Sequence, residues 1–258
     1  MNAAYAALAS LLWAEIAHAD CRQALAIGLD VSASVDEQEY ALQMQGVARA
    51  LADPKVTSAL LDQPLKPVWL AAYTWSGAES QRLILDWTAM TDADAILRAA
   101  TAIGTAPRPA LSPSTGVGTA LLYGHALLDR GPDCWRYTLD LTGDGKNNSG
   151  PQPRQLALAP LGAALTVNAL VIGSDEEEGW DGGDPGIAEL TAWFWVEVVR
   201  GPDGFVEAAL GFEDFEAAMT RKLLKELSGF AVGTAPPPRP EPVERGRGGA
   251  PEPLPEDG

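Results

Sequence analysis

The segment that decides the fold is residues 24–34, which read ALAIGLDVSAS. The part from Ala24 to Leu29 is a continuous apolar run, which is typical of a strand covered on both faces in a parallel sheet. The run ends at Asp30, and hydroxyl side chains follow at the alternate positions Ser32 and Ser34. The segment therefore predicts a buried parallel strand that ends in a polar loop.

The segments that follow alternate between helical and strand-like patterns. Apolar residues repeat at helical spacing from Tyr40 to Leu51, and Asp53-Pro54 predicts the end of that helix. Only residues 76–80 separate the strand-like runs 68–75 and 81–87, which predicts an antiparallel hairpin because a parallel crossover needs a dozen or more residues. The remaining predicted elements are strands at 137–141, 166–172 and 205–208, and helices at 92–102, 116–128, 187–199 and 213–227.

This alternation of strands and helices predicts one α/β domain from residue 20 to residue 233. We expect a doubly wound, mostly parallel six-stranded sheet with one antiparallel edge strand and helices on both faces. In such sheets, ligands bind beyond the carboxyl ends of the strands, where the strand order reverses. The residues at those ends are therefore the candidates for function.

The charge balance of the chain excludes several classes of partner. The 258 residues carry 35 acidic and 18 basic side chains, which give a formal net charge of −17. Nucleic-acid phosphates and anionic lipids would be repelled, whereas basic partners and metal ions are compatible with this charge. Two cysteines and two histidines are a poor ligand set for structural zinc.

The two ends of the chain differ from the domain in composition. Residues 1–19 are rich in Ala and Leu and end in Ala17-His18-Ala19, a pattern typical of a signal peptide, although no Lys or Arg precedes the apolar part. We expect a periplasmic or secreted protein; an ordinary amphipathic helix is the alternative. Residues 234–258 hold 8 of the 20 prolines and predict a disordered tail. No apolar run approaches the roughly 20 residues that span a bilayer, so we expect no membrane span.

Three predicted loops carry hard oxygen donors. Asp30, Ser32 and Ser34 follow the first strand, Thr115 stands at the start of a middle helix, and Asp144 follows the fourth strand. Two carboxylates and three hydroxyls suit a small hard cation, Mg²⁺ or Mn²⁺, better than they suit Zn²⁺. The alternative is that Asp30, Ser32 and Thr115 cap helices and that Asp144 belongs to an ordinary turn.

These residues also carry a resemblance to a known family. Asp-x-Ser-x-Ser at 30–34, Thr-x-x-Gly-x-Ala-Leu at 115–121 and an Asp-Gly turn at 144–145 resemble, in the same order, the metal-ion-dependent adhesion site (MIDAS) of von Willebrand factor type A (vWA) domains. The resemblance covers nearly the whole domain. More narrowly, the chain is similar to an uncharacterised bacterial group of secreted proteins of this type, domain of unknown function 1194, in the runs 30–45, 141–148, 201–206 and 212–227.

The resemblance implies a role for each residue of the motifs. Ser32 and Ser34 would bind the metal directly, Thr115 would be the third hydroxyl, and Asp30 and Asp144 would bind directly or through water. The remaining metal position would be filled by an Asp or Glu carboxylate of a partner protein. The implied function is a divalent-cation-dependent protein-binding module that is not an enzyme.

Two other functions stay open on the sequence. A Mg²⁺-dependent, phosphatase-like hydrolase could use Asp30 as nucleophile or metal ligand. Against it, Ser32 stands where an Asp-x-Asp pair would have its second carboxylate. The third interpretation is a scaffold that keeps the vWA fold without a functional metal.

Two further features bear on location and charge. In this fold class the first and fourth strands are parallel neighbours, so Cys21 and Cys134, near the starts of these strands, predict a disulfide. Such a bond requires an oxidising compartment, and two buried free thiols are the alternative. The run from Asp175 to Asp184 places six carboxylates in ten residues and predicts a solvated acidic loop rather than a calcium site. That loop would favour basic partners at the rim of the candidate site.

Overall fold

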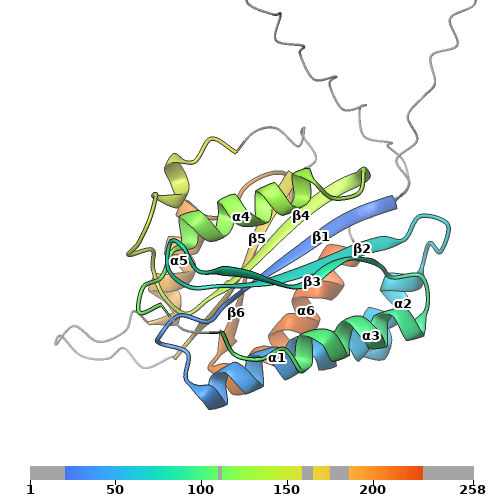
Figure 1. The fold of residues 1–258 in the computed structure, drawn as a ribbon, viewed down its shortest axis with the longest axis horizontal. Coiled ribbons are helices and arrows are strands. Elements are labelled where there is room, and N and C mark those ends of the chain that lie inside the picture. Colours follow the sequence, from blue (N-terminus) through green and yellow to red (C-terminus); the bar gives the residue numbers. More distant parts are fainter. Residues whose placement is uncertain (1–20, 110–111, 159–164, 175–185, 229–258) are drawn as a thin grey trace, which may run out of the picture.

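The computed structural model describes residues 21–109, 112–158, 165–174 and 186–228. Within these residues, six strands form one sheet in the order β3-β2-β1-β4-β5-β6 (Figure 1). All neighbouring pairs are parallel except β2 and β3. This confirms the predicted doubly wound sheet with an antiparallel edge strand. The strands are β1 (Cys21–Asp30), β2 (Val68–Trp75), β3 (Gln81–Ala89), β4 (Cys134–Gly143), β5 (Leu165–Gly173) and β6 (Val206–Leu210).

Helices cover both faces of the sheet and enclose two apolar cores (Figure 1). One core lies under α1, α2, α3 and α6, and the other lies under α4 and α5. All ten residues of β1 are buried, as expected for a central parallel strand. The helices are α1 (Glu37–Ala52), α2 (Pro54–Leu61), α3 (Ala93–Gly104), α4 (Val117–Asp129), α5 (Ile187–Glu197) and α6 (Phe215–Ser228).

One helix was not expected from the sequence. Asp53-Pro54 does end α1, but the same dipeptide begins α2. Proline is well tolerated at the first helical position because its missing N–H would have no partner there. The Asp53 carboxylate caps the new helix, since it accepts hydrogen bonds from the backbone N–H groups of Lys55 (2.8 Å) and Val56 (3.2 Å). A stop signal for one helix is therefore also a start signal for the next.

The sheet topology determines where the candidate residues lie. The strand order reverses at β1, because β2 lies on one side of it and β4 on the other. β1 ends at Asp30 and β4 ends at Gly143, and the two strands are parallel. The loops that follow them therefore emerge side by side at what we call the carboxyl edge of the sheet.

The opposite edge is closed by the predicted disulfide, which the structure confirms. Cys21 and Cys134 are direct partners in the register of β1 and β4, their Cα atoms are 4.7 Å apart, and the sulfurs are bonded. The bond joins residues 113 positions apart in the chain. In the chain-entropy account, closing so long a loop stabilises the fold by about 4–5 kcal/mol.

Several sequence-based expectations concern residues outside those described. These are the export signal at 1–19, the acidic run from Asp175 to Asp184, and the tail at 234–258. All three stay predictions, as do the exact domain boundaries at 20 and 233. Among the described residues, no helix has the length and apolar character needed to cross a bilayer.

Candidate metal centre

The site begins at Asp30, the last residue of β1. Its side chain is fully buried, and Oδ1 accepts a hydrogen bond from the backbone N–H of Ser32 at 2.8 Å. Oδ2 is also buried and has no partner with good hydrogen-bond geometry among the described residues. Burial, and then the neighbouring Asp144 carboxylate, raise the pKa of Asp30 well above its ordinary value of 3.8 and outweigh the Ser32 hydroxyl and the Asp144 N–H, which lie near the carboxylate and lower its pKa. A buried carboxylate is thus held beside a second carboxylate.

A chain of hydroxyl contacts joins the loop after β1 to the loop after β4. Ser32 is buried and Ser34 is exposed, and their Oγ atoms are 3.1 Å apart. Ser34 Oγ in turn donates to Oδ1 of Asp144 at 2.9 Å, across 110 positions in the sequence. The structure therefore brings three of the five candidate residues into direct contact, next to Asp30.

Thr115 reaches the same place from the loop before α4. A β-carbon built on Gly145 would lie 3.7 Å from Thr115 Oγ1, so the threonine hydroxyl lies beside the Asp144-Gly145 turn. Asn148 fixes this arrangement: its Oδ1 accepts from the N–H of Thr115 at 2.8 Å, and its own N–H donates to the Thr115 carbonyl at 2.9 Å. All five candidates thus lie at the carboxyl edge.

The capping alternative is wrong for these residues. The N-cap of α1 is Asp36, which forms a capping box with Glu39: each backbone N–H donates to the other residue's carboxylate, at 2.7 and 2.8 Å. The N-cap of α4 is Gly116, which has no side chain to act as a cap. Asp30, Ser32 and Thr115 therefore need another explanation.

Residues that sequence reasoning missed hold the site together. Asn147 Oδ1 accepts a hydrogen bond from the N–H of Gly118 at 3.1 Å, so this asparagine and Asn148 tie the loop after β4 to the start of α4. The signal in the sequence was the Asn147-Asn148 pair, one residue after the Asp144-Gly145 turn. Two further residues, Gln43 and Thr142, lie buried behind Asp30 and give no such local signal.

The donor set fits a hard divalent cation. No group of three or more His, Cys, Asp or Glu side chains suited to a metal occurs in the part of the chain that the structure describes. The site instead offers two carboxylates and three hydroxyls, which are oxygen ligands of the kind that Mg²⁺ and Mn²⁺ take. The unpaired buried oxygen of Asp30 is explained if a positive charge occupies the space between it and Asp144.

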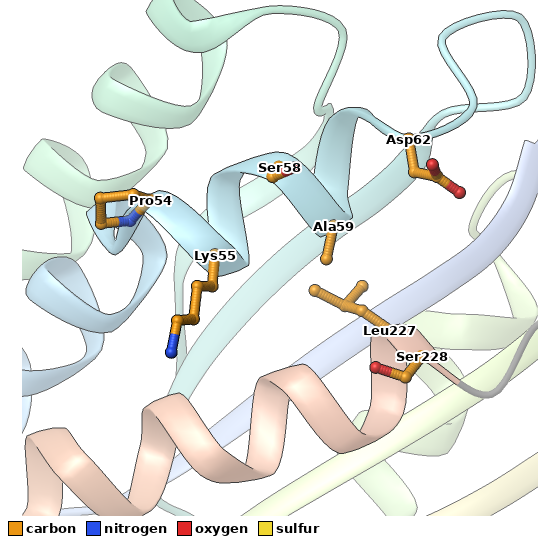
Figure 2. Close-up of a pocket in the computed structure, with 7 residues that line it drawn as sticks. All are labelled: Pro54, Lys55, Ser58, Ala59, Asp62, Leu227 and Ser228. Carbon is orange, nitrogen blue, oxygen red and sulfur yellow. The ribbon is translucent and has the colours of Figure 1, made fainter.

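The one pocket shown in close-up lies elsewhere (Figure 2). Its volume is about 490 Å³, and it lies between α2 and the end of α6. Ala59, which lines it, accepts a hydrogen bond through its carbonyl from Arg22, the second residue of β1. The pocket is therefore at the edge where β1 starts, and none of its lining residues is a metal-site candidate.

The comparison with protein families gives a match over most of the chain. The profile of the family described as "Protein of unknown function (DUF1194)" matches residues 20–231. The chain belongs to the DUF1194 family. This confirms the resemblance seen in the sequence motifs. Among curated proteins, no significant match to the DUF1194 chain was found.

Solved structures similar to the DUF1194 chain include a vWA protein and a protein with a MIDAS motif. Proximal thread matrix protein 1 (PTMP1) from the mussel byssus, in a structure with a zinc-occupied MIDAS motif, is 16% identical over 81% of this chain and 48% of its own, with a TM-score of 0.57. A von Willebrand factor type A protein from Catenulispora acidiphila is 17% identical (81% and 42% covered, TM-score 0.52). The pilus adhesin SpaC from Lactobacillus rhamnosus GG is 14% identical (80% and 30% covered, TM-score 0.54). The DUF1194 chain therefore has the vWA fold and spans less than half of each of these proteins.

Proposed function

We propose that this DUF1194 chain is a divalent-cation-dependent protein-binding module. Asp30, Ser32, Ser34, Thr115 and Asp144 would hold Mg²⁺ or Mn²⁺ at the carboxyl edge of the sheet. A bound cation would bridge these side chains to an Asp or Glu carboxylate of a partner protein. The observation that carries the proposal is the contact between Ser34 and Asp144, which joins two distant loops beside the unpaired Asp30 oxygen.

The exposure of the site supports binding of a large partner. Asp30 and Ser32 are buried, whereas Ser34 is exposed and Asp144 is half-buried. The buried pair would face the cation from the protein side, and the exposed side would keep water that a ligand can displace. A carboxylate on a protein surface can reach such a position without a deep cleft.

The structural neighbours support a role in binding rather than catalysis. They include a matrix protein of mussel byssus and a pilus adhesin. The zinc in the MIDAS of PTMP1 also means that Zn²⁺ has to be tested beside Mg²⁺ and Mn²⁺. The disulfide is of the kind that persists in oxidising compartments, which supports a periplasmic or secreted location.

The first test is calorimetric titration with Mg²⁺, Mn²⁺ and Zn²⁺. We expect saturable binding to the wild type and its loss in Ser34→Ala, which removes the hydroxyl between the two loops. The matched control is Ser58→Ala, at the opposite edge of the sheet, which should bind like the wild type. Absence of binding to the wild type, or equal binding to Ser34→Ala, would contradict the proposal.

The second test concerns the partner. Wild type, Ser34→Ala and Ser58→Ala are immobilised and exposed to envelope proteins in Mg²⁺ or in EDTA. We expect a protein that is retained in Mg²⁺ by the wild type and Ser58→Ala, released by EDTA, and not retained by Ser34→Ala. Retention that is unchanged by EDTA would contradict cation dependence. Metal-dependent hydrolysis of phosphate esters, abolished in Asp30→Asn, would support the hydrolase instead.

A further inference from the structure

A closed ring of hydrogen bonds lies behind the candidate metal centre. Gln43 of α1 is fully buried, and its Nε2 donates to the carbonyl oxygen of Asp30 at 2.8 Å. Its Oε1 accepts from Oγ1 of Thr142 at 2.7 Å. Thr142 Oγ1 accepts in turn from the backbone N–H of Asp30 at 3.0 Å. The ring therefore engages both backbone groups of Asp30 and joins three elements, α1, β1 and β4.

This ring connects β1 to β4 beyond the last paired residues of these two strands. The register of β1 with β4 ends at the pair Gly28 and Leu141, two residues before Asp30. Beyond that pair, Asp30 is connected to β4 through the Thr142 side chain and not through a backbone pair. Thr142 is two residues before Asp144 in the chain. The ring thus fixes the main chain of one candidate carboxylate against the strand that carries the other.

A glutamine at position 43 is otherwise unexpected. Its neighbours on the buried side of α1 include Tyr40, Met44 and Val47, so an apolar residue would fit the pattern of the helix. Burying an amide is unfavourable unless it is hydrogen-bonded. Here the amide nitrogen of Gln43 donates to Asp30 and the amide oxygen accepts from Thr142, so both ends of the amide are hydrogen-bonded at the carboxyl edge.

We propose that Gln43 and Thr142 are positioning residues of the cation site, which set the separation of the Asp30 and Asp144 carboxylates. This inference rests on the proposed function. A rigid separation favours Mg²⁺, which demands near-ideal octahedral geometry, over the larger Ca²⁺, which accepts flexible ligand sets. Loosening the ring therefore reduces both the affinity for Mg²⁺ and the preference for Mg²⁺ over Ca²⁺.

The variants are chosen to separate positioning from simple loss of stability. Thr142→Val keeps the shape of the side chain but breaks the ring, Thr142→Ser keeps the hydroxyl, and Gln43→Met removes the amide. The matched control is Thr138→Val, because Thr138 lies on the same strand and its Oγ1 accepts a buried hydrogen bond from Gln23 at 2.8 Å, away from the site. Circular dichroism and thermal unfolding in EDTA establish that each variant is folded.

The measurement is the affinity for Mg²⁺ and for Ca²⁺ by calorimetry. We expect Thr142→Val and Gln43→Met to bind Mg²⁺ about tenfold or more weakly, as is typical when a residue that supports metal ligands is lost. Their ratio of Mg²⁺ to Ca²⁺ affinity should fall, whereas Thr142→Ser and Thr138→Val should keep the wild-type ratio. If the Thr142→Val variant does not fold, Gln43→Met provides the same comparison.

Each outcome decides between distinct conclusions. Wild-type affinity and selectivity in Thr142→Val and Gln43→Met, with Mg²⁺ binding intact in the wild type, would overturn the positioning role and leave the proposed function standing. An equal loss of Mg²⁺ affinity and selectivity in Thr138→Val would show a general effect of destabilising β4 and would also overturn the positioning role. A wild type that binds no divalent cation would remove the proposed function and the positioning role together.

Discussion

Two pairs of neighbouring carboxylates include a residue of β4 or of the loop that follows it, and the contacts described around the two pairs differ. In the first pair, Asp140 and Glu226 of α6 meet in the interior, and both form ion pairs with the buried Lys222 of α6. Lys222 Nζ is 2.5 Å from the Glu226 carboxylate, and Asn168 of β5 donates to the same carboxylate at 2.7 Å. The interior pair therefore has an ammonium group built into the fold.

The second pair, Asp30 and Asp144, contrasts with the first. The contacts described around Asp30 come from Ser32, from Gln43 and Thr142 behind the strand, and from Asp144 itself. Burial lowers the pKa of Lys222, but Asp140 and Glu226 outweigh burial and raise it overall. Burial, and then Glu226, also raise the pKa of Asp140, so one ammonium group is shared by two buried carboxylates. This contrast supports the proposal that the pair at the carboxyl edge binds a cation from solution.

The largest expected effect comes from removing the internal cation. Lys222→Met leaves Asp140 and Glu226 buried without a positive charge, and breaking a buried ion pair in this way costs about 3–5 kcal/mol. We expect urea unfolding to show a loss of that size. The control is Lys225→Met, since Lys225 is exposed and its ammonium group lies over the ring of Phe205. If Lys222→Met were as stable as the wild type, the ammonium group would not stabilise the interior cluster.

The next effect comes from supplying the external cation. Binding to the folded state alone stabilises it by about 2.7 kcal/mol when the free ligand is at 100 times its dissociation constant. We expect Mg²⁺ or Mn²⁺ to raise the Tm of the wild type by this mechanism, and Ser32→Ala to lose the increase. A cation-induced increase in Tm of equal size in Ser32→Ala would mean that the ion binds elsewhere. It would contradict the contrast between the interior pair and the pair at the carboxyl edge.

A charge-removing substitution should have opposite effects with and without metal. Asp30→Asn removes the repulsion from Asp144, so we expect the protein in EDTA to gain about 1 kcal/mol, within the range of single stabilising substitutions. The same variant should show no stabilisation by Mg²⁺. The two measurements are made by urea unfolding of one preparation, with and without the ion. A less stable variant in EDTA would show that the Asp30 carboxylate is already balanced without an added cation.

The smallest effect is a dependence on pH. Burial, and then Asp144, raise the pKa of Asp30 above its ordinary value of 3.8. A raised pKa in the folded state contributes stability that is complete below the unfolded pKa and is lost as the pH rises through the folded pKa. In EDTA, the wild type should therefore lose stability relative to Asp30→Asn as the pH increases from about 4 towards neutrality. Saturating Mg²⁺ should reduce this loss. A stability difference between the wild type and Asp30→Asn that does not change with pH would contradict the prediction.

Much of the fold follows from local sequence patterns. The apolar run that became β1, the five-residue connection of the β2–β3 hairpin and the alternation of elements all determine topology directly. Topology in turn puts the ends of β1 and β4 together, so the meeting of Ser34 with Asp144 and the pairing of Cys21 with Cys134 could both be predicted. These features depend on which strands are neighbours and not on side-chain detail.

The buried polar groups could not be predicted in the same way. Lys222 and Glu226 have the four-residue spacing of an ordinary surface ion pair on a helix, and only the packing of α6 on the sheet buries them beside Asp140. Gln43 likewise occupies one position of an otherwise apolar helix face. Whether such a residue is buried depends on helix rotation, which the chain's own periodicity does not fix to within one residue.

The most direct test of the central claim is a crystal structure of the protein soaked in Mn²⁺, with anomalous diffraction data. The claim is that a cation from solution sits between Asp30 and Asp144. We expect one strong anomalous peak at the carboxyl edge, with Ser32 and Ser34 among its neighbours, and no peak beside Asp140. A map without a peak at the carboxyl edge, or with its main peak at the acidic run from Asp175 to Asp184, would contradict the account.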